Sequence, residues 1–245
     1  MNTRAATALV AVLGVVVVSA TGASTGAAEA QCVIPRGKEQ VRLDPADFTT
    51  RITNPWWPMR VGARWVYRET APDGTRQHGV VTVLRKTKVV ADGVTARVVH
   101  DVATEAGVPI EITDDWYAQD RCGNVWYLGE ATTEYENGKP VSTEGSFEAG
   151  VDGAQPGVIV PAHPKSGMSY RQEYYKGHAE DMAEVAQVGT TKAVALGQYS
   201  DVIVIKEWNP LEPDVVEQKY YAPGVGVIAE ETLKGGDEKA ELTGT

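Results

Sequence analysis

The stretch "PIEITDDWYAQDRCGNVWYLGEATTEYE", residues 109–136, decides the fold. Two runs rich in β-branched and aromatic residues flank "RCGN", Arg121–Asn124, which has the composition of a hairpin turn. Such runs favour strands, and a short Gly-containing turn between them favours antiparallel pairing. The stretch therefore predicts a β-hairpin.

The same alternation of turn signals and strand-like runs extends along most of the chain. Further turn signals are "PDG" at 72–74, "ADG" at 91–93, "EAG" at 105–107 and "ENG" at 136–138. Asp-Gly and Asn-Gly supply the positive φ angles that tight hairpins require. Strands are predicted over residues 64–69, 78–90, 95–104, 109–120, 124–136, 139–147, 169–175, 192–196, 201–208, 215–221 and 225–233. The fold class that follows is all-β or β-dominated: a single antiparallel meander.

The predicted β domain spans residues 63–234, and the segments before it, after it and at its centre lack the strand pattern. Residues 1–30 combine a basic start, an apolar run and small residues, as a secretory signal peptide does. Residues 31–62 read as an extended arm that Trp56 and Trp57 anchor to the core. Residues 149–168 are rich in Gly and Pro and predict a loop, and the tail 235–245 predicts disorder. No later segment is apolar enough to span a membrane, so we expect a secreted, extracellular protein.

The formal charge of −10 and the pI near 4.9 exclude some classes of partner. Nucleic-acid binding needs clustered Lys and Arg, so no nucleic-acid partner is expected. The two cysteines of an exported chain predict a disulfide between Cys32 and Cys122. Lipidation of Cys32 is the alternative.

The C-terminal third carries a resemblance. "KAVALGQYSDVIVIKEW" at 192–208 and "VEQKYYAPGVGVIAEE" at 216–231 resemble a signature of secreted actinobacterial β proteins. "DWYAQD", "GNVWYLGE" and "VDGAQPG" are similar to the same group. More distantly, the chain resembles the half-barrel lipoprotein carriers of the LolA kind. That resemblance implies a curved sheet or half-barrel with a concave face, and it implies no particular ligand.

One acidic stretch is the first candidate site. "YRQEYYKGHAEDMAEV", Tyr170–Val185, reads either as a helix from 178 to 188 or as a hairpin with its turn at Lys176-Gly177. The strand interpretation is favoured, and it places Glu173 opposite Glu180, beside His178. These three side chains then form a candidate divalent-cation site, with two solvated glutamates on a surface hairpin as the favoured alternative. No other cofactor is expected.

Aromatic residues around the 121–124 turn form the second candidate site. Trp116, Tyr117, Trp126 and Tyr127 put one aromatic ring of each strand on either face, and one pair could form a platform for a ligand. Ordinary cross-strand packing is the stronger alternative. Asp120 to Asn124 faintly resembles a calcium loop.

These observations leave three hypotheses for function. The first is a secreted, non-enzymatic protein that binds a small or apolar ligand on the concave face. The second is an extracellular hydrolase or lyase acting on a polymer, without a recognisable nucleophile motif. The third is a cation-dependent structural or adhesion module. A cavity lined by carboxyl groups with shifted pKa values would favour the enzyme, and a dry apolar groove would favour the carrier.

Overall fold

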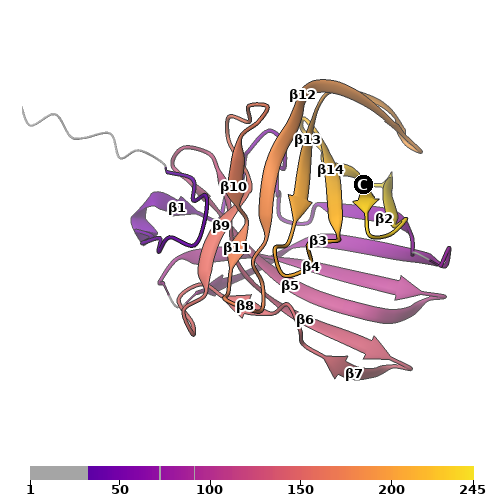
Figure 1. Ribbon diagram of the computed structural model, residues 1–245, viewed down its shortest axis with the longest axis horizontal. Helices are drawn as coiled ribbons and strands as arrows, with labels where there is room; N and C mark the ends of the chain where they lie inside the picture. Colours follow the sequence, from indigo (N-terminus) through magenta and orange to yellow (C-terminus); the bar gives the residue numbers. More distant parts are fainter. Residues whose placement is uncertain (1–32, 72, 91) are drawn as a thin grey trace, which may run out of the picture. The chain divides into compact units, whose positions relative to one another are not determined.

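Antiparallel pairing joins all strands of the described residues into one sheet (Figure 1). The computed structural model describes residues 33–71, 73–90 and 92–245. A 3-10 turn, η1 (Pro45–Asp47), precedes the first strand. The strands are β1 (Phe48–Thr49), β2 (Arg64–Thr70), β3 (Arg76–Val89), β4 (Thr95–Glu105), β5 (Val108–Asp120), β6 (Val125–Glu136), β7 (Lys139–Ser142), β8 (Phe147–Glu148), β9 (Gln155–Val160), β10 (Ser169–Arg171), β11 (Glu173–Tyr174), β12 (Met182–Val194), β13 (Gly197–Trp208), β14 (Val216–Ala222), β15 (Gly226–Lys234) and β16 (Lys239–Gly244).

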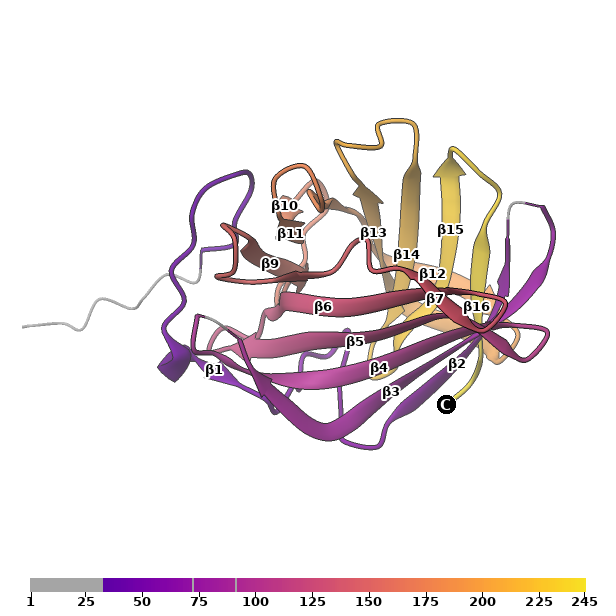
Figure 2. The same ribbon diagram turned by 90° about the horizontal axis from the view of Figure 1, so that it is seen from below.

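The order of the strands makes the sheet a nearly closed, barrel-like curve. It runs β10-β12-β13-β14-β15-β16-β2-β3-β4-β5-β6-β9-β11, with β1, β7 and β8 attached at its side. The first and last strands of this path, β10 and β11, are consecutive in the chain and are separated only by Gln172. A single segment therefore lies at both ends of the path. Figure 2 shows β2–β6 crossing β13–β15 at a steep angle, as a strongly coiled sheet requires.

The hairpins from β2 to β7 confirm the predicted meander, whereas the predicted loop at 149–168 is wrong in its centre. Strand β9 lies there, and all six of its residues are buried. A Cβ atom at Gly157 would lie 2.4 Å from the carbonyl oxygen of Arg171, so only glycine allows β9 to approach the segment between β10 and β11. Glycine here marks a close backbone approach, and not a loop.

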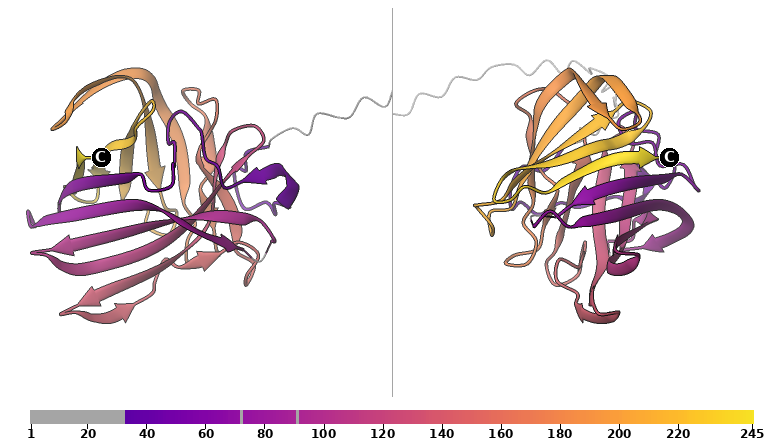
Figure 3. Two further views of the ribbon diagram at one scale, coloured as in Figure 1. Left: turned by 180° about the vertical axis from the view of Figure 1, so that it is seen from behind. Right: turned by 90° about the vertical axis from the view of Figure 1, so that its right-hand side faces the viewer.

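The prediction of a disordered tail is also wrong. Strand β16 pairs with β15 on one side and with β2 on the other, so it joins the two halves of the sheet (Figure 3). Leu242 of β16 is fully buried, and Glu241 receives a hydrogen bond from Arg68 at 2.6 Å. One apolar anchor and backbone pairing on both sides hold a segment that is otherwise polar.

The N-terminal arm packs onto the sheet through a tryptophan, as predicted. The Trp57 ring lies 5.3 Å from the ring of Tyr117 on β5 and 6.1 Å from that of Tyr221 on β14, while Trp56 is partly buried. Nearer its start, the arm is held by Arg171, which is 1% exposed. Its guanidinium donates to the carbonyls of Gly37 and Glu39 at 2.6 and 2.8 Å. The arm is therefore part of the folded body.

Two predictions concern residues outside the described part of the chain. The signal peptide at 1–30 and the cysteine at 32 both lie there. Cys122 lies between β5 and β6, at the tip of their hairpin. The Cys32–Cys122 disulfide therefore stays a prediction. In the described ranges, no helix has the length and apolar character needed to cross a membrane.

Candidate functional site

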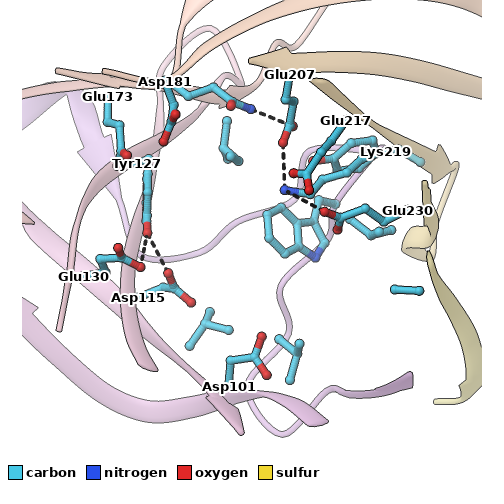
Figure 4. Close-up of a pocket in the computed structure, with 18 of the residues that line it drawn as sticks. Asp101, Asp115, Tyr127, Glu130, Glu173, Asp181, Glu207, Glu217, Lys219 and Glu230 are labelled. Atoms are coloured by element: carbon cyan, nitrogen blue, oxygen red, sulfur yellow. Dashed lines mark hydrogen bonds and ion pairs between the residues drawn. The ribbon is translucent and has the colours of Figure 1, made fainter. Parts of the chain in front are cut away.

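The curved sheet encloses a cavity of about 530 Å³ whose described lining is dominated by acids and aromatic rings (Figure 4). Its volume lies within the range of ligand pockets, about 300–1,000 Å³. Ten carboxyl groups line it: Glu69, Asp101, Asp115, Glu130, Glu173, Asp181, Glu207, Glu212, Glu217 and Glu230. Aromatic side chains also line it: Trp57, Tyr67, Tyr117, Tyr127, Trp208 and Tyr221. Among the described lining residues, Lys219 is the one cationic side chain.

Strand alternation places most of these side chains. Residues two apart share one face of a strand, and on β14 that face carries Glu217, Lys219 and Tyr221. The same rule directs Asp115 and Tyr117 of β5 inward. The inner face of the sheet is thus polar, and it is not the dry apolar groove expected of a carrier.

An irregularity in β6 adds one acid to the inner face. Tyr127 and Glu130 are three apart, so regular alternation would direct them to opposite faces. The register between β5 and β6 shifts at this point, and Gly129 has a φ of 138°. A Cβ atom at Gly129 would lie 2.4 Å from the carbonyl oxygen of Phe147 on β8. The bulge lets both Tyr127 and Glu130 face the cavity.

Tyr127 links two carboxyl groups. Its hydroxyl lies 2.9 Å from Oδ1 of Asp115 and 2.8 Å from Oε2 of Glu130. A phenol carries one proton, so it donates to one carboxyl group and accepts from the other, which must itself be protonated. Burial raises the pKa of Glu130 to about 7, and burial together with the charge of Glu130 raises the pKa of Asp115 well above its usual range. In this arrangement one of the two carboxyl groups therefore carries a proton besides that of the phenol.

A second pair of acids adjoins this group. The backbone amides of Gln172 and Glu173 both donate to the carbonyl oxygen of Asp181, at 2.8 and 3.3 Å. Burial, and then a hydrogen bond with the side chain of Asp181, raise the pKa of Glu173 well above its usual range. Glu173 is only 5% exposed, and its Oε2 has no hydrogen-bond partner in the described part of the chain.

The other side of the cavity has its own positive charge. Lys219 donates to Glu207 at 2.7 Å and lies 3.9 Å from Glu230. Gln172 also donates to Glu207, at 2.8 Å. Burial opposes the charge of Lys219, but Glu207 and Glu230 outweigh it and raise the pKa of the ammonium group well above its usual range. Lys219 therefore stays charged and compensates the acids around it (Figure 4).

The four aromatic residues predicted as a ligand platform divide between the two faces. Tyr117 and Tyr127 line the cavity, and their rings stack with centroids 5.1 Å apart. Trp126 donates instead to Asp120 at 2.9 Å, and Lys88 lies 4.3 Å from the ring centroid of Trp116. The pair available to a ligand in the cavity is the tyrosine pair.

The residues predicted as a cation site are not brought together. The turn comprises three residues, Lys176–His178, because Tyr175 pairs with Ala179, and the register is therefore displaced by one from the prediction. Glu173 consequently faces Asp181. Glu180 instead forms an ion pair with Lys38 of the arm at 3.1 Å.

The alternative interpretation of that hairpin as a solvated surface is also wrong, since Glu173 and Glu180 are 5% and 6% exposed. The His178 ring stacks on Tyr175 at 4.4 Å. No helix forms at 178–188, where β12 begins at Met182. Among the described residues, no group of three His, Cys, Asp or Glu side chains could hold a metal ion.

The faint calcium-loop pattern has a structural explanation. The carboxylate of Asp120 accepts hydrogen bonds from the backbone amides of Cys122 and Asn124, both at 2.9 Å, and from the Asn124 and Trp126 side chains at 2.8 and 2.9 Å. These bonds hold the hairpin turn, because the carboxylate caps the amides of the turn. Asp120 thus belongs to the scaffold.

Comparisons with known proteins give only distant structural likenesses, which carry no argument about this chain. The sequence matches no family model and no curated protein. Among solved structures, a "putative exported protein with YmcC-like fold" from Bacteroides fragilis is similar, with 15% identity and a TM-score of 0.44 over 76% of this chain and 96% of that chain. A "putative lipoprotein" from Parabacteroides distasonis has 12% identity and a TM-score of 0.40 over the same shares. The resemblance to actinobacterial proteins and to LolA-like carriers stays a prediction.

The sequence analysis missed most of the cavity acids. Their signal lies in strands that carry polar residues on both faces, such as "EQKYYA" at 217–222 and "IAEE" at 228–231. A half-buried strand normally shows polar residues on one face only. A strand with polar residues on both faces therefore indicates that the interior of the sheet is polar.

Proposed function

We propose that this chain is a secreted, non-enzymatic protein that binds a small molecule inside its barrel-like sheet. The observation that carries the proposal is the cavity of about 530 Å³, which side chains from β2–β6, β9, β11 and β13–β16 line. The predicted signal peptide supports export. The ten carboxyl groups of the lining weigh against an apolar ligand, since an apolar molecule would leave buried polar groups without partners.

A filled-cavity variant tests this proposal. Val81→Trp places an indole in the cavity, whereas Val89→Trp, at an exposed position (62%) of the same strand, is the matched control. Thermal-shift measurements with amines, carboxylic acids, sugars and neutral aromatic compounds should give ligands that raise the melting temperature of the wild type and the control, and not that of Val81→Trp. If every ligand stabilises the three proteins equally, the cavity is not the binding site.

An enzyme that acts on a polymer is the second candidate, and the cavity meets the criterion given for it in the sequence analysis, since carboxyl groups with raised pKa values line it. Two carboxyl groups with raised pKa values, those of Asp115 and Glu130, flank one hydroxyl, an arrangement that suits general acid catalysis near neutral pH. The described cavity lining includes no serine, histidine or cysteine, so this chemistry would rest on acids and tyrosines. Release of reducing ends from secreted polysaccharides, lost in Glu130→Gln, would establish it.

A further inference from the structure

Six of the ten cavity acids fall into two groups that differ in their compensation. One group, Glu207 and Glu230, has Lys219 between its members. The other group, which we call the acid wall, comprises Asp115, Glu130, Glu173 and Asp181 (Figure 4). No Lys or Arg of the described cavity lining contacts the acid wall. Bound protons neutralise carboxyl groups of the acid wall instead, as the raised pKa values of Asp115, Glu130 and Glu173 indicate.

A buried carboxyl oxygen in the acid wall has no partner. Oε2 of Glu173 receives no hydrogen bond from the described residues, although the residue is only 5% exposed. Buried polar atoms are nearly always paired, and an unpaired one costs about 1–3 kcal/mol. A ligand that donates an N–H to this oxygen would remove that cost.

The surroundings of the acid wall favour an organic cation over a metal ion. The stacked rings of Tyr117 and Tyr127 adjoin it, and Trp57 lies 5.3 Å from Tyr117. Aromatic rings attract ammonium groups and also bury the apolar part of an organic ligand. Calcium, in contrast, needs six to eight oxygen ligands, and the described acids form no metal-holding group.

We propose that the cavity binds a small protonated organic amine, whose ammonium group donates to Glu173 and lies against Asp115 and Glu130. This inference rests on the proposed function, and it names the ligand class of the same cavity. The ammonium group compensates the negative charge of the acid wall, as Lys219 compensates that of Glu207 and Glu230 on the opposite side.

Binding of an amine should release protons from the carboxyl groups, because the charge of the ligand takes the place of theirs. The groups that face Glu173 are Asp181 on the neighbouring strand segment, Asp115 and Glu130 on β5 and β6, and the Tyr127 hydroxyl. A cation beside Glu173, Asp115 and Glu130 favours the ionised forms of these three groups. Protons are therefore released on binding, and affinity rises with pH through the range near 7 in which Glu130 ionises.

Tyramine and tyrosol are suitable probes, because they share a phenol ring and differ in an ammonium against a hydroxyl group. Titration calorimetry at neutral pH, in phosphate and in MOPS, gives both affinity and the number of protons released, and neither buffer is a primary amine that would compete for the cavity. Tyramine should bind the full-length mature protein about tenfold or more tightly than tyrosol, since only the ammonium group forms charged hydrogen bonds. Cyclohexylamine and spermidine, tested in the same way, cover protonated amines of other shapes.

Two matched variants locate the ammonium group. Glu173→Gln should weaken tyramine binding about tenfold and reduce the proton release, while leaving tyrosol unaffected. Glu180→Gln, on the same hairpin but paired with Lys38, should change neither. Asp181→Asn serves as the second variant if Glu173→Gln does not fold.

Three results would overturn the inference. One is equal binding of tyramine and tyrosol that Val81→Trp abolishes, and this result leaves the proposed function intact. Another is that none of the three amines binds at millimolar concentration while neutral compounds or acids from the wider panel do. The last is that Glu180→Gln weakens amine binding as much as Glu173→Gln does. If no compound of either kind binds, the proposed function fails as well.

Discussion

The hydroxyl of Tyr127 lies 2.8 Å from Oε2 of Glu130, although three residues along a regular strand would separate the two side chains onto opposite faces. The bulge at Gly129 brings them together, and Asp115 completes the group from the neighbouring strand. The bulge in the pairing of β5 and β6 thus brings together a buried group of side chains that binds a proton. Its energetic consequence is a stability that depends on pH.

We expect the free energy of unfolding to fall as the pH rises from about 5 to about 8. Burial raises the pKa of Glu130 from 4.5 to about 7 in the folded state, so the folded state binds this proton more tightly than the unfolded state does. The contribution is fully present below the unfolded pKa and is lost as the pH rises through the folded pKa. For Glu130 it amounts to at most about 3 kcal/mol.

Urea denaturation at several pH values measures this dependence. Glu130→Gln should be more stable than the wild type at pH 8 and should flatten the profile, because the amide needs no proton. Glu136→Gln, an exposed position at the end of the same strand, is the control and should leave the profile unchanged. A wild-type profile that rises between pH 5 and pH 8 would contradict the assignment of buried, protonated acids.

Removal of the ammonium group of Lys219 should destabilise the protein at neutral pH. Lys219→Met leaves Glu207 and Glu230 facing each other without a cation. Breaking a fully buried pair costs about 3–5 kcal/mol; because 26% of the Lys219 side chain is exposed, we expect about 2–3 kcal/mol. The loss should shrink at pH 5, because burial raises the pKa of Glu230 to about 7 and this acid is then protonated.

Lys86→Met provides the comparison for that variant. Its ammonium group lies 2.9 Å from Asp114 on the outer surface, and 63% of its side chain is exposed. Exposed pairs contribute about 0–1 kcal/mol, so the change in stability should be small. Equal losses in the two variants would show that Lys219 has no special role in compensating the cavity acids.

The Cys32–Cys122 disulfide is tested on the mature secreted protein. Intact mass with and without reductant, followed by alkylation of thiols, should show no free thiol before reduction and two after it. In the chain-entropy model, closing a loop of this length stabilises the fold by about 4 kcal/mol. Two free thiols, or a lipid-modified Cys32, would contradict the prediction.

The strands of the first half could be predicted because their turns carry a local signal. Gly74, Gly93, Gly107 and Gly138 each have a φ between 74° and 83°, as the Gly-containing turn motifs of the sequence indicate. The turn at Lys176–His178 was misjudged by one residue, since a three-residue turn leaves the same composition as a shorter one. That single step moves every following side chain to the other face.

The sequence does not show which acids meet in the cavity, because composition alone assigns carboxyl groups to the surface. Glu173 and Glu180 show the difficulty: they lie on one hairpin, both are buried, and one faces the cavity while the other pairs with Lys38 of the arm. Lys38 lies more than a hundred residues away in the sequence. Only the closure of the sheet decides which acids meet.

The last prediction concerns that closure, where β9 meets the segment of β10 and β11. A Cβ atom at Gly157 would lie 2.4 Å from the carbonyl oxygens of both Arg171 and Gln172. Backbone atoms cannot move aside as a flexible side chain can, so Gly157→Ala must push β9 away from this segment. Overpacking of this kind costs about 1–3 kcal/mol.

Gly244→Ala on β16 is the matched control, because it also lies in a strand and its new Cβ would meet Val66 at an ordinary 3.5 Å. Urea denaturation should show a loss for Gly157→Ala and little change for Gly244→Ala. Hydrogen exchange should also increase at Gln155 and Tyr174, which pair between β9 and β11. Since Glu173 belongs to the acid wall, amine binding should weaken in the same variant. If Gly157→Ala keeps full stability and slow exchange at these residues, the close approach of β9 to the closing segment is wrong.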